Sequence, residues 1–288
     1  MSLSLAVSST GPRAQAGGFL GLLGVAGRRV FFALAVVAIL LIFIGPVAIL
    51  LLTSVRPPSG VYYIWRGWEF TLDNFAEVLA QPVVLHSMWN SFVLSSIATV
   101  ASLGVTVGSG YMLSRFTGPI QRSWFGIIYV FRTVPYISWV LPLYLVTTNL
   151  GIYDTYLGLL LPHVAVHVCF FSWIMKGFFD SISPSMEHAA LIDGCTRWGA
   201  FRRVALPSAM PGIAALAILS WLWTWNEFLF GLILTAQRTP VITVTMAQFV
   251  TETGTEWHLM SATAVLAMLP ALLITIFGQK YVVRGLRM

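Results

Sequence analysis

Long apolar stretches alternate with short polar segments along most of this chain. A helix needs about 20 mainly apolar residues to cross the hydrocarbon core of a membrane. Several of the stretches contain proline, which membrane helices tolerate where neighbouring groups satisfy the freed backbone carbonyls. The pattern predicts an all-α, polytopic membrane protein with six transmembrane helices. Their expected positions are 31–54, 91–116, 123–147, 156–178, 212–235 and 259–283.

The composition supports this class of protein. Hydrophobic residues make up 58% of the chain and charged residues 9%, whereas soluble domains carry about 25% charged residues. A net charge of +6 would favour a nucleic-acid ligand in a soluble protein. Here the basic residues cluster at the ends of apolar stretches, so we assign them to membrane orientation and expect no nucleic-acid partner. The two cysteines, Cys169 and Cys195, give no disulfide framework.

The first apolar stretch resembles an export signal, because Arg28 and Arg29 precede it. A cleaved signal has an apolar region of only about 7–15 residues and a small-residue cleavage site. This stretch is longer, and no A-x-A site closes it. We therefore expect a retained first transmembrane helix.

The distribution of Lys and Arg sets the orientation, because these residues are enriched in cytoplasmic loops. With the N-terminus inside, twelve basic residues lie on the inner side and three, Arg56, Arg66 and Arg238, on the outer side. We expect a multi-pass protein of the cytoplasmic (inner) membrane, in contact with lipid, with both termini in the cytoplasm. Its expected parts are a cytoplasmic tail (1–29), the first transmembrane helix with an extracytoplasmic loop (30–86), the transmembrane core (87–283) and a cytoplasmic C-terminus (284–288).

A polar segment, 183–207, interrupts the apolar pattern on the cytoplasmic side. Pro184 behind Ser183 is typical of the first turn of a helix behind its N-cap. Gly194 should end this helix, since glycine accepts the left-handed conformation that follows helix C-termini.

Thr196 is placed to cap a second short helix, 197–203. Pro207 and Pro211 should then turn the chain before the fifth span begins. The segment is therefore expected to form a helix–turn–helix bracket, in which small residues such as Ala189 let a partner approach closely.

The bracket carries the motif on which a family resemblance rests. Residues 187–194 read E-H-A-A-L-I-D-G, and residues 204–207 read V-A-L-P. This pattern resembles the signature E-A-A-x-x-x-G, followed by I-x-L-P, in the cytoplasmic loop of ABC-importer permeases. The order of spans over 31–287 and four short segments are also similar to the carbohydrate-importer branch: 53–58, 70–75, 89–92 and 225–229. The resemblance implies a type I ABC-importer permease fold, like the six-span maltose-type permease that pairs with a larger sister subunit.

The sequence departs from this family at two places. His188 stands immediately before the two alanines, where relatives usually have a glutamate. We expect an altered or pH-sensitive polar contact there. The sequence also ends at Met288, where many relatives continue with a short tail that reaches the ATPase subunits. We therefore do not expect a C-terminal contact of this kind with the ATPase subunits.

The resemblance implies that the bracket, 183–207, is a coupling helix that seats in a groove of a cytoplasmic ATPase. The residues assigned to this coupling are Glu187, His188, Ala189, Ala190, Asp193, Gly194, Arg197, Phe201, Leu206 and Pro207. The implied partners are a sister permease in a heterodimer, two copies of a nucleotide-binding ATPase, and an extracytoplasmic solute-binding protein or lipoprotein.

No G-x-x-x-x-G-K-[ST] phosphate loop is present in the sequence, so ATP hydrolysis is expected to come from another chain. We expect a transport subunit rather than an enzyme, with no catalytic residue, metal or bound cofactor of its own. ATP and magnesium would be used by the partner ATPase.

Two charged residues, Arg132 and Glu227, lie within the expected spans. Each costs about 2.5–3.5 kcal/mol at the centre of a membrane helix, so both should face a cavity or a partner. We assign them, with Trp225 and Asn226, to a sugar pathway, because aromatic faces and amides suit the CH faces and hydroxyls of sugars. Packing or an interfacial belt equally explains the tryptophans, and Glu227 could instead pair with Arg132 or the sister subunit. In maltose-type relatives the sister subunit supplies most direct sugar contacts.

His163 and His167 are four residues apart on the fourth expected span. Their spacing allows a metal site with Cys169, but no acidic ligand lies nearby in the sequence, so we expect buried, hydrogen-bonded histidines. The outer loops, 55–90 and 236–258, hold tryptophans and acidic residues. Interfacial anchoring is favoured there over a docking surface for an external partner.

These observations favour the permease subunit of an ATP-driven importer of an oligo- or disaccharide. The same architecture could import glycerol phosphate, a polyamine or an amino acid, although only Arg132 offers positive charge to a phosphate ester. An ion-coupled secondary transporter agrees less well with the cytoplasmic signature. A membrane enzyme is least favoured, because no nucleophile–base set stands out in the sequence.

Overall fold

The computed structural model describes residues 24–61, 69–252 and 254–285. Two compact units make up the chain, 1–50 and 51–288. Most of the expected cytoplasmic tail lies outside the described residues, as do Trp65, Arg66 and Trp68 of the first outer loop.

The first expected span is confirmed as the helix α1, Val25–Ser54. Its helical path continues through Pro46. Its side chains from Val30 to Leu52 are almost all apolar, on every face of the helix. A helix that is hydrophobic all round is typical of a membrane span.

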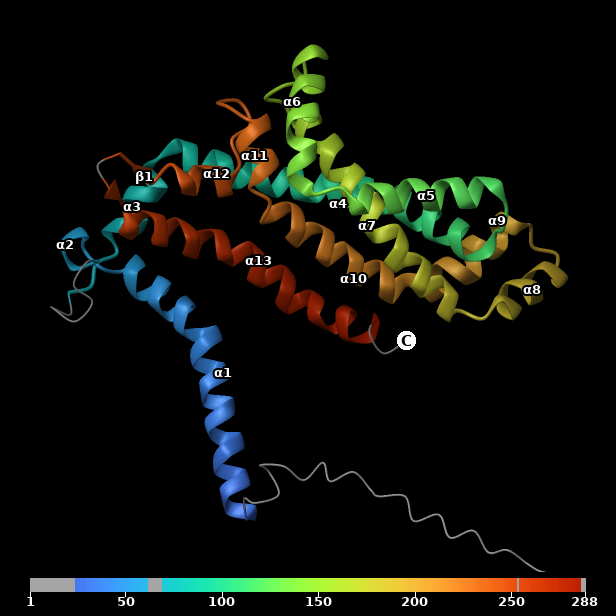
Figure 1. Cartoon of the computed structure of the whole chain (residues 1–288), viewed down its shortest axis with the longest axis horizontal. Coiled ribbons are helices and arrows are strands. Elements are labelled where there is room, and N and C mark those ends of the chain that lie inside the picture. The colour runs from blue at the N-terminus through green and yellow to red at the C-terminus, as the bar shows by residue number, and fades with distance from the viewer. Residues whose placement is uncertain (1–23, 62–68, 253, 286–288) are drawn as a thin grey trace, which may run out of the picture. The chain divides into compact units, whose positions relative to one another are not determined.

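Four long helices form the framework of the second unit (Figure 1): α4 (Pro82–Arg115), α7 (Tyr156–Ser181), α10 (Leu206–Trp225) and α13 (Trp257–Gly285). The second, fourth and sixth expected spans are confirmed by α4, α7 and α13, each long and apolar enough to cross a membrane. The helix α4 packs against both α7 and α10, and α10 packs against α13. This framework holds the elements at the two ends of the bundle.

Close helix contacts in the framework depend on small residues. A Cβ added to Gly212 in α10 would stand 2.5 Å from Cγ of Phe178 in α7, so the two helices approach here only because the side chain is missing. The buried face of α4 is rich in small polar residues, among them Ser95, Ser102 and Thr106. Small residues are typical of helix interfaces in membranes, where they let backbones come close.

The third expected span, 123–147, is a pair of helices with a break between them rather than one continuous helix. The helix α5 (Pro119–Thr133) ends before a short 3₁₀ turn, η2 (Tyr136–Trp139), and α6 (Val140–Asn149) follows. The two parts are bent by 104°. Pro135 explains the break, because proline disfavours the helical conformation at the preceding residue. Val134 is accordingly extended, with φ −72° and ψ 127°.

The fifth expected span, 212–235, was misplaced at both ends. Helical structure starts at Arg197, in α9 (Arg197–Ala200), and runs through the π turn η3 (Phe201–Ala205) into α10, which ends at Trp225. Within the π turn, the N–H of Leu206 bonds to the carbonyl of Phe201, five residues back.

Pro207 and Pro211 do not turn the chain, contrary to expectation. Pro207 lies in the first turn of α10, where a missing N–H costs little, and Pro211 lies inside the helix. The residues after Trp225 form α11 (Leu229–Leu234) and α12 (Ile242–Ala247) instead of further transmembrane helix. Glu227 therefore occupies the break after α10.

The remaining elements lie at the two ends of the framework. At one end are α2 (Pro58–Val61), α3 (Asp73–Ala80) and an antiparallel hairpin of β1 (Val250–Thr251) and β2 (Gly254–Thr255). At the other end are α8 (Pro184–Ile192) and α9, in the segment expected on the cytoplasmic side (Figure 1).

Candidate functional site

The polar bracket forms much as its sequence indicates. The helix α8 begins at Pro184 behind Ser183, and Gly194 follows it in the left-handed region with φ 87°. Thr196 caps α9, because its side-chain oxygen accepts a hydrogen bond from the Gly199 N–H at 3.1 Å. The Ser183 side chain does not cap α8, since its hydroxyl lies 2.8 Å from that of Ser185.

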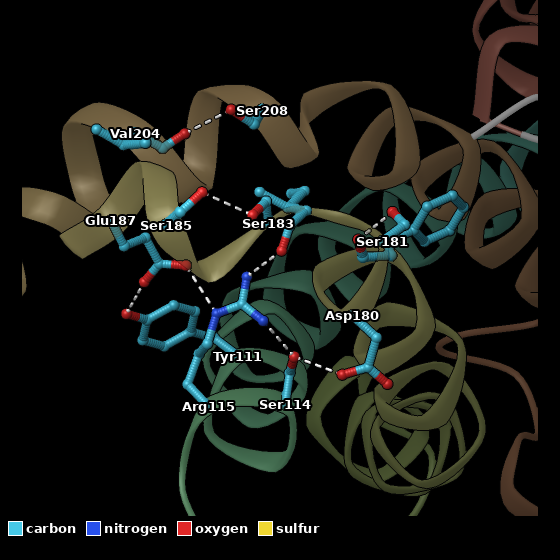
Figure 2. Close-up of polar contacts among 12 residues, drawn as sticks. Tyr111, Ser114, Arg115, Asp180, Ser181, Ser183, Ser185, Glu187, Val204 and Ser208 are labelled. Carbon is cyan, nitrogen blue, oxygen red and sulfur yellow. Dashed lines mark hydrogen bonds and ion pairs between the residues drawn. The ribbon is translucent and has the colours of Figure 1, made fainter. Parts of the chain in front are cut away.

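Glu187 joins α8 to the end of α4 (Figure 2). The Tyr111 hydroxyl donates a hydrogen bond to Oε2 of Glu187 at 2.6 Å, and Nε of Arg115 donates to Oε1 at 2.7 Å. Nη2 of Arg115 also donates to the carbonyl of Ile182, just before α8, at 2.8 Å. We call Tyr111, Arg115 and Glu187 the clasp.

The clasp is a well-satisfied, largely buried ion pair. Only 12% of the Arg115 side chain and 8% of the Glu187 side chain are exposed. Both carboxylate oxygens of Glu187 accept a hydrogen bond, and charge-assisted hydrogen bonds are about twice as strong as neutral ones. The acidic group also lies in the first turn of α8, where the helix dipole favours a negative charge. The clasp therefore fixes α8 against α4.

Three of the residues assigned to ATPase coupling are buried in this chain. Glu187 is engaged in the clasp, Ala190 is 9% exposed, and Phe201 is buried against Tyr111, with their ring centroids 4.6 Å apart. Their surroundings in the fold indicate that they hold the bracket in place. Local sequence could not reveal this, because Tyr111 and Arg115 lie more than 70 residues away.

Most of the other residues assigned to coupling lie on the exposed surface of the bracket. The exposed members are His188, Ala189, Asp193, Gly194, Arg197 and Pro207, whereas Leu206 is half-buried. Sequence reasoning missed four exposed apolar neighbours: Met186, Leu191, Ile192 and Trp198. Ile192 is 87% exposed and Trp198 68% exposed. Exposed apolar groups gathered in one place mark an interaction site.

A polar cavity of about 240 Å³ lies beside the clasp. Its lining includes Arg115, Glu187, His188 and Arg197. His188, which replaces the expected glutamate, thus faces a site that also holds two arginines.

The Glu227 carboxylate bonds to backbone N–H groups and does not pair with Arg132. Its carboxylate accepts hydrogen bonds from the N–H groups of Phe230 at 3.0 Å and Gly231 at 3.3 Å, so it caps α11. Oε2 of Glu227 also lies 3.8 Å from Nε2 of His163. Arg132 instead lies over the Phe170 ring, 5.4 Å from its centroid.

The two residues before Glu227 differ in exposure. Trp225 is 4% exposed, packs in a hydrophobic cluster and donates from Nε1 to the Ala267 carbonyl at 3.2 Å. Asn226 is exposed, and its side-chain nitrogen donates to the carbonyl of Leu222 at 2.7 Å. For Trp225, these contacts favour the packing interpretation that the sequence left open.

The expectation of buried, hydrogen-bonded histidines is confirmed. Nδ1 of His163 lies 2.7 Å from the Leu159 carbonyl, and Nδ1 of His167 lies 2.9 Å from the Ser220 hydroxyl in α10. Both side chains are at most 2% exposed. The contact of His167 helps to join α7 to α10, whereas that of His163 lies within α7.

Asp154 organises the end of the bundle opposite α8, a role that the sequence did not reveal. Its carboxylate accepts hydrogen bonds from four successive backbone N–H groups, those of residues 236–239, and from the Thr239 hydroxyl. Burial by itself would raise the pKa of Asp154, but the hydrogen bonds from Ala236, Arg238 and Thr239 outweigh it and lower that pKa. The α6–α7 loop is thereby fixed to the segment after α11.

Several known proteins are similar to this chain. It is 30% identical over 269 residues to the probable ABC transporter permease protein y4oR of Sinorhizobium fredii, covering 91% of this chain and 95% of that protein. It is 30% identical to the trehalose transport system permease protein SugB of Mycobacterium tuberculosis, covering 75% of this chain and 80% of that protein.

Among solved structures, a bacterial ABC transporter involved in the import of the acidic polysaccharide alginate matches with a TM-score of 0.72 at 22% identity. The match covers 90% of this chain and 98% of that one. This likeness confirms the ABC-importer permease fold. Residues 101–288 match the profile of the family described as binding-protein-dependent transport system inner membrane component. With most of its length matched, the chain belongs to the family of inner membrane components of binding-protein-dependent transport systems.

Proposed function

We propose that this chain is the membrane subunit of an ATP-driven importer that carries an oligo- or disaccharide across the cytoplasmic membrane. The observation that carries the proposal is the bracket, which combines an exposed apolar surface with a firm attachment to the spans. Relatives named for the transport of trehalose and of arabinooligosaccharides support a sugar as the solute.

The bracket would act as the coupling element. Its exposed residues, with Ala189 and Ile192 at the surface of α8, would seat on a cytoplasmic ATPase. Two connections then lead from α8 into the membrane. The clasp joins α8 to α4, and α9 runs through the π turn into α10. Movement of the ATPase surface would therefore displace α4 and α10 together.

The proposed assembly contains a sister permease, two ATPase subunits and an extracytoplasmic solute-binding protein. ATP and magnesium would bind to the ATPase subunits. Both termini of this chain would be cytoplasmic, because α8 carries the ATPase-facing surface and the basic residues gather on the same side.

The sugar pathway would pass the region of the two interrupted spans. Arg132 and Asn226 are exposed in this chain and would face it, while Trp225 and Glu227 would hold its wall in place. Breaks in membrane helices are tolerated where they line a cavity or pack against protein, which agrees with this placement.

The coupling proposal is tested with Ala189→Asp in the complete, purified transporter. Ala189 is exposed on α8, so the charge should leave the fold intact and block the apolar contact with the ATPase. The expected result is an assembled complex that has lost substrate-stimulated ATP hydrolysis. Ser123→Asp, an exposed site at the start of α5, is the matched control and should retain stimulation. Retained stimulation in Ala189→Asp would show that α8 does not couple.

The same preparation tests the alternatives to a sugar importer. Uptake that tracks a proton gradient and survives removal of ATP would support an ion-coupled transporter instead. If ATP hydrolysis is stimulated by glycerol phosphate, a polyamine or an amino acid, and by no saccharide, the chain is still an importer subunit but its solute is not a sugar.

A further inference from the structure

Arg132 is a charged group at membrane depth beside a cavity. It lies 13 residues after Pro119 in α5, which corresponds to about 20 Å along the helix. This position lies inside the third expected span, 123–147, where it is the tenth residue. A cavity of about 350 Å³ lies between the bent third span and α7, and Arg132 is part of its lining. Small-molecule sites begin at about this volume.

The guanidinium of Arg132 has no carboxylate partner among the residues that the structure describes. Glu227, the acidic residue expected to pair with it, is occupied by the backbone of α11. An arginine at this depth is costly unless it meets an anion or water. The fold thus presents a cation without supplying its counter-charge.

Aromatic rings form much of the remaining lining of this cavity. Phe131 and Trp139 stack nearly in parallel, with centroids 4.6 Å apart and planes 9° apart. Phe170 lies below the guanidinium of Arg132, and Tyr136 stacks on Phe230 with centroids 4.5 Å apart. Aromatic faces suit the CH faces of a sugar ring. A carboxylate side chain from another subunit could pair with Arg132 without any aromatic lining, so the lining favours a sugar as the partner.

We propose that this cavity receives an acidic saccharide, whose carboxylate or sulfo group pairs with Arg132 while the sugar ring packs on the aromatic lining. Arginine suits this role because its planar guanidinium binds carboxylate and related oxyanions through two parallel hydrogen bonds. The proposal rests on the proposed sugar-import function and specifies its substrate class.

The test uses the complete transporter in proteoliposomes with pairs of disaccharides that differ only in charge. Suitable pairs are cellobiose with cellobiouronate and 1,4-galactobiose with digalacturonate. The expected result is uptake of an acidic member at least about tenfold above that of its neutral partner. Arg132→Gln should reduce this preference by about tenfold or more, and Arg132→Lys should restore part of it. Arg122→Gln, an exposed cation at the other end of α5, should leave it unchanged.

Each contrary result has a separate meaning. Uptake of neutral members alone, unaffected by Arg132→Gln, would overturn the acidic substrate and leave the sugar importer standing. Uptake of no saccharide, acidic or neutral, would overturn both. Loss of complex assembly in Arg132→Gln would show that Arg132 binds the sister subunit rather than the substrate, which would overturn the proposal. An effect of Arg132→Gln confined to vesicles with phosphatidylglycerol, and absent with phosphatidylcholine alone, would assign it to lipid.

Discussion

Arg115 at the end of α4 and Glu187 in α8 form an ion pair, with Nε and Oε1 2.7 Å apart. The pair joins two elements separated by 72 residues in the chain. It attaches α8 to the end of α4. A substitution on the exposed surface of α8, such as Ala189→Asp, should therefore affect coupling alone. A substitution in the clasp should affect both coupling and stability.

Glu187→Ala should uncouple the transporter and destabilise this chain. The substitution leaves Arg115 largely buried without its counter-charge, which costs about 2–5 kcal/mol. We expect a lower thermal unfolding temperature of the purified complex and weaker substrate stimulation of ATP hydrolysis. Glu187→Gln should be intermediate, because it keeps one oxygen acceptor.

The matched control for the clasp is the neighbouring pair of Lys176 and Asp180. This pair lies within one helix, and its side chains are 27% and 44% exposed. Asp180 also accepts a hydrogen bond from the Ser114 hydroxyl of α4 at 2.6 Å, so the control variant is Lys176→Ala, which leaves that contact in place. Exposed pairs contribute at most about 1 kcal/mol, so Lys176→Ala should change stability and coupling little. Equal effects of Glu187→Ala and Lys176→Ala would contradict the special role of the clasp.

Asp154→Asn should weaken the end of the bundle opposite α8 in a pH-dependent way. The folded-state pKa of Asp154 is lowered from its ordinary value of 3.8. Its contribution to stability is therefore fully present above that value and is lost as the pH falls through the folded-state pKa. At neutral pH, losing hydrogen bonds to a charged acceptor should cost about 1.5–3 kcal/mol.

Thermal unfolding at several pH values would measure this effect. The difference between the wild type and Asp154→Asn should be large at pH 7 and should shrink below pH 3.8. Asp73→Asn, an exposed acidic site in α3, is the control. A difference that stays constant over the whole pH range would rule out the titration of Asp154 as the cause.

Gly212→Ala should destabilise the contact between α10 and α7. The added Cβ would stand 2.5 Å from Cγ of Phe178, which forces the ring or the helix to shift. Overpacking of this kind costs about 1–3 kcal/mol. Gly108→Ala, on α4, meets no atom within 4 Å and should be neutral or slightly stabilising. Comparing the unfolding temperatures of the two variants tests the contact, and equal values would contradict it.

Substitutions at Glu227 separate capping from substrate contact. Glu227→Gln keeps a side-chain oxygen for the N–H of Phe230, whereas Glu227→Ala removes the cap of α11 and should cost about 0.5–2 kcal/mol. We expect near-normal uptake in Glu227→Gln and reduced uptake and stability in Glu227→Ala. Lost uptake with unchanged stability in Glu227→Gln would instead place the carboxylate on the substrate.

Local signals predicted the parts of the bracket well. Pro184, Gly194 and Thr196 mark helix boundaries because each acts on backbone within a few residues of itself. Longer-range features were harder to predict. A proline inside an apolar run is compatible with a straight, kinked or broken helix. The bundle breaks the third span at Pro135, yet it carries α10 through Pro211.

Composition, length and local backbone preference were sufficient to predict the membrane class, the apolar segments and the place of the bracket in the chain. Which side of the bracket faces inward depends on contacts with distant parts of the chain. Glu187 and His188 are adjacent in the sequence, yet Glu187 is buried in the clasp and His188 is exposed. The physical reason is that an ion pair forms only where folding brings its two partners together, and the partners of Glu187 come from a distant helix.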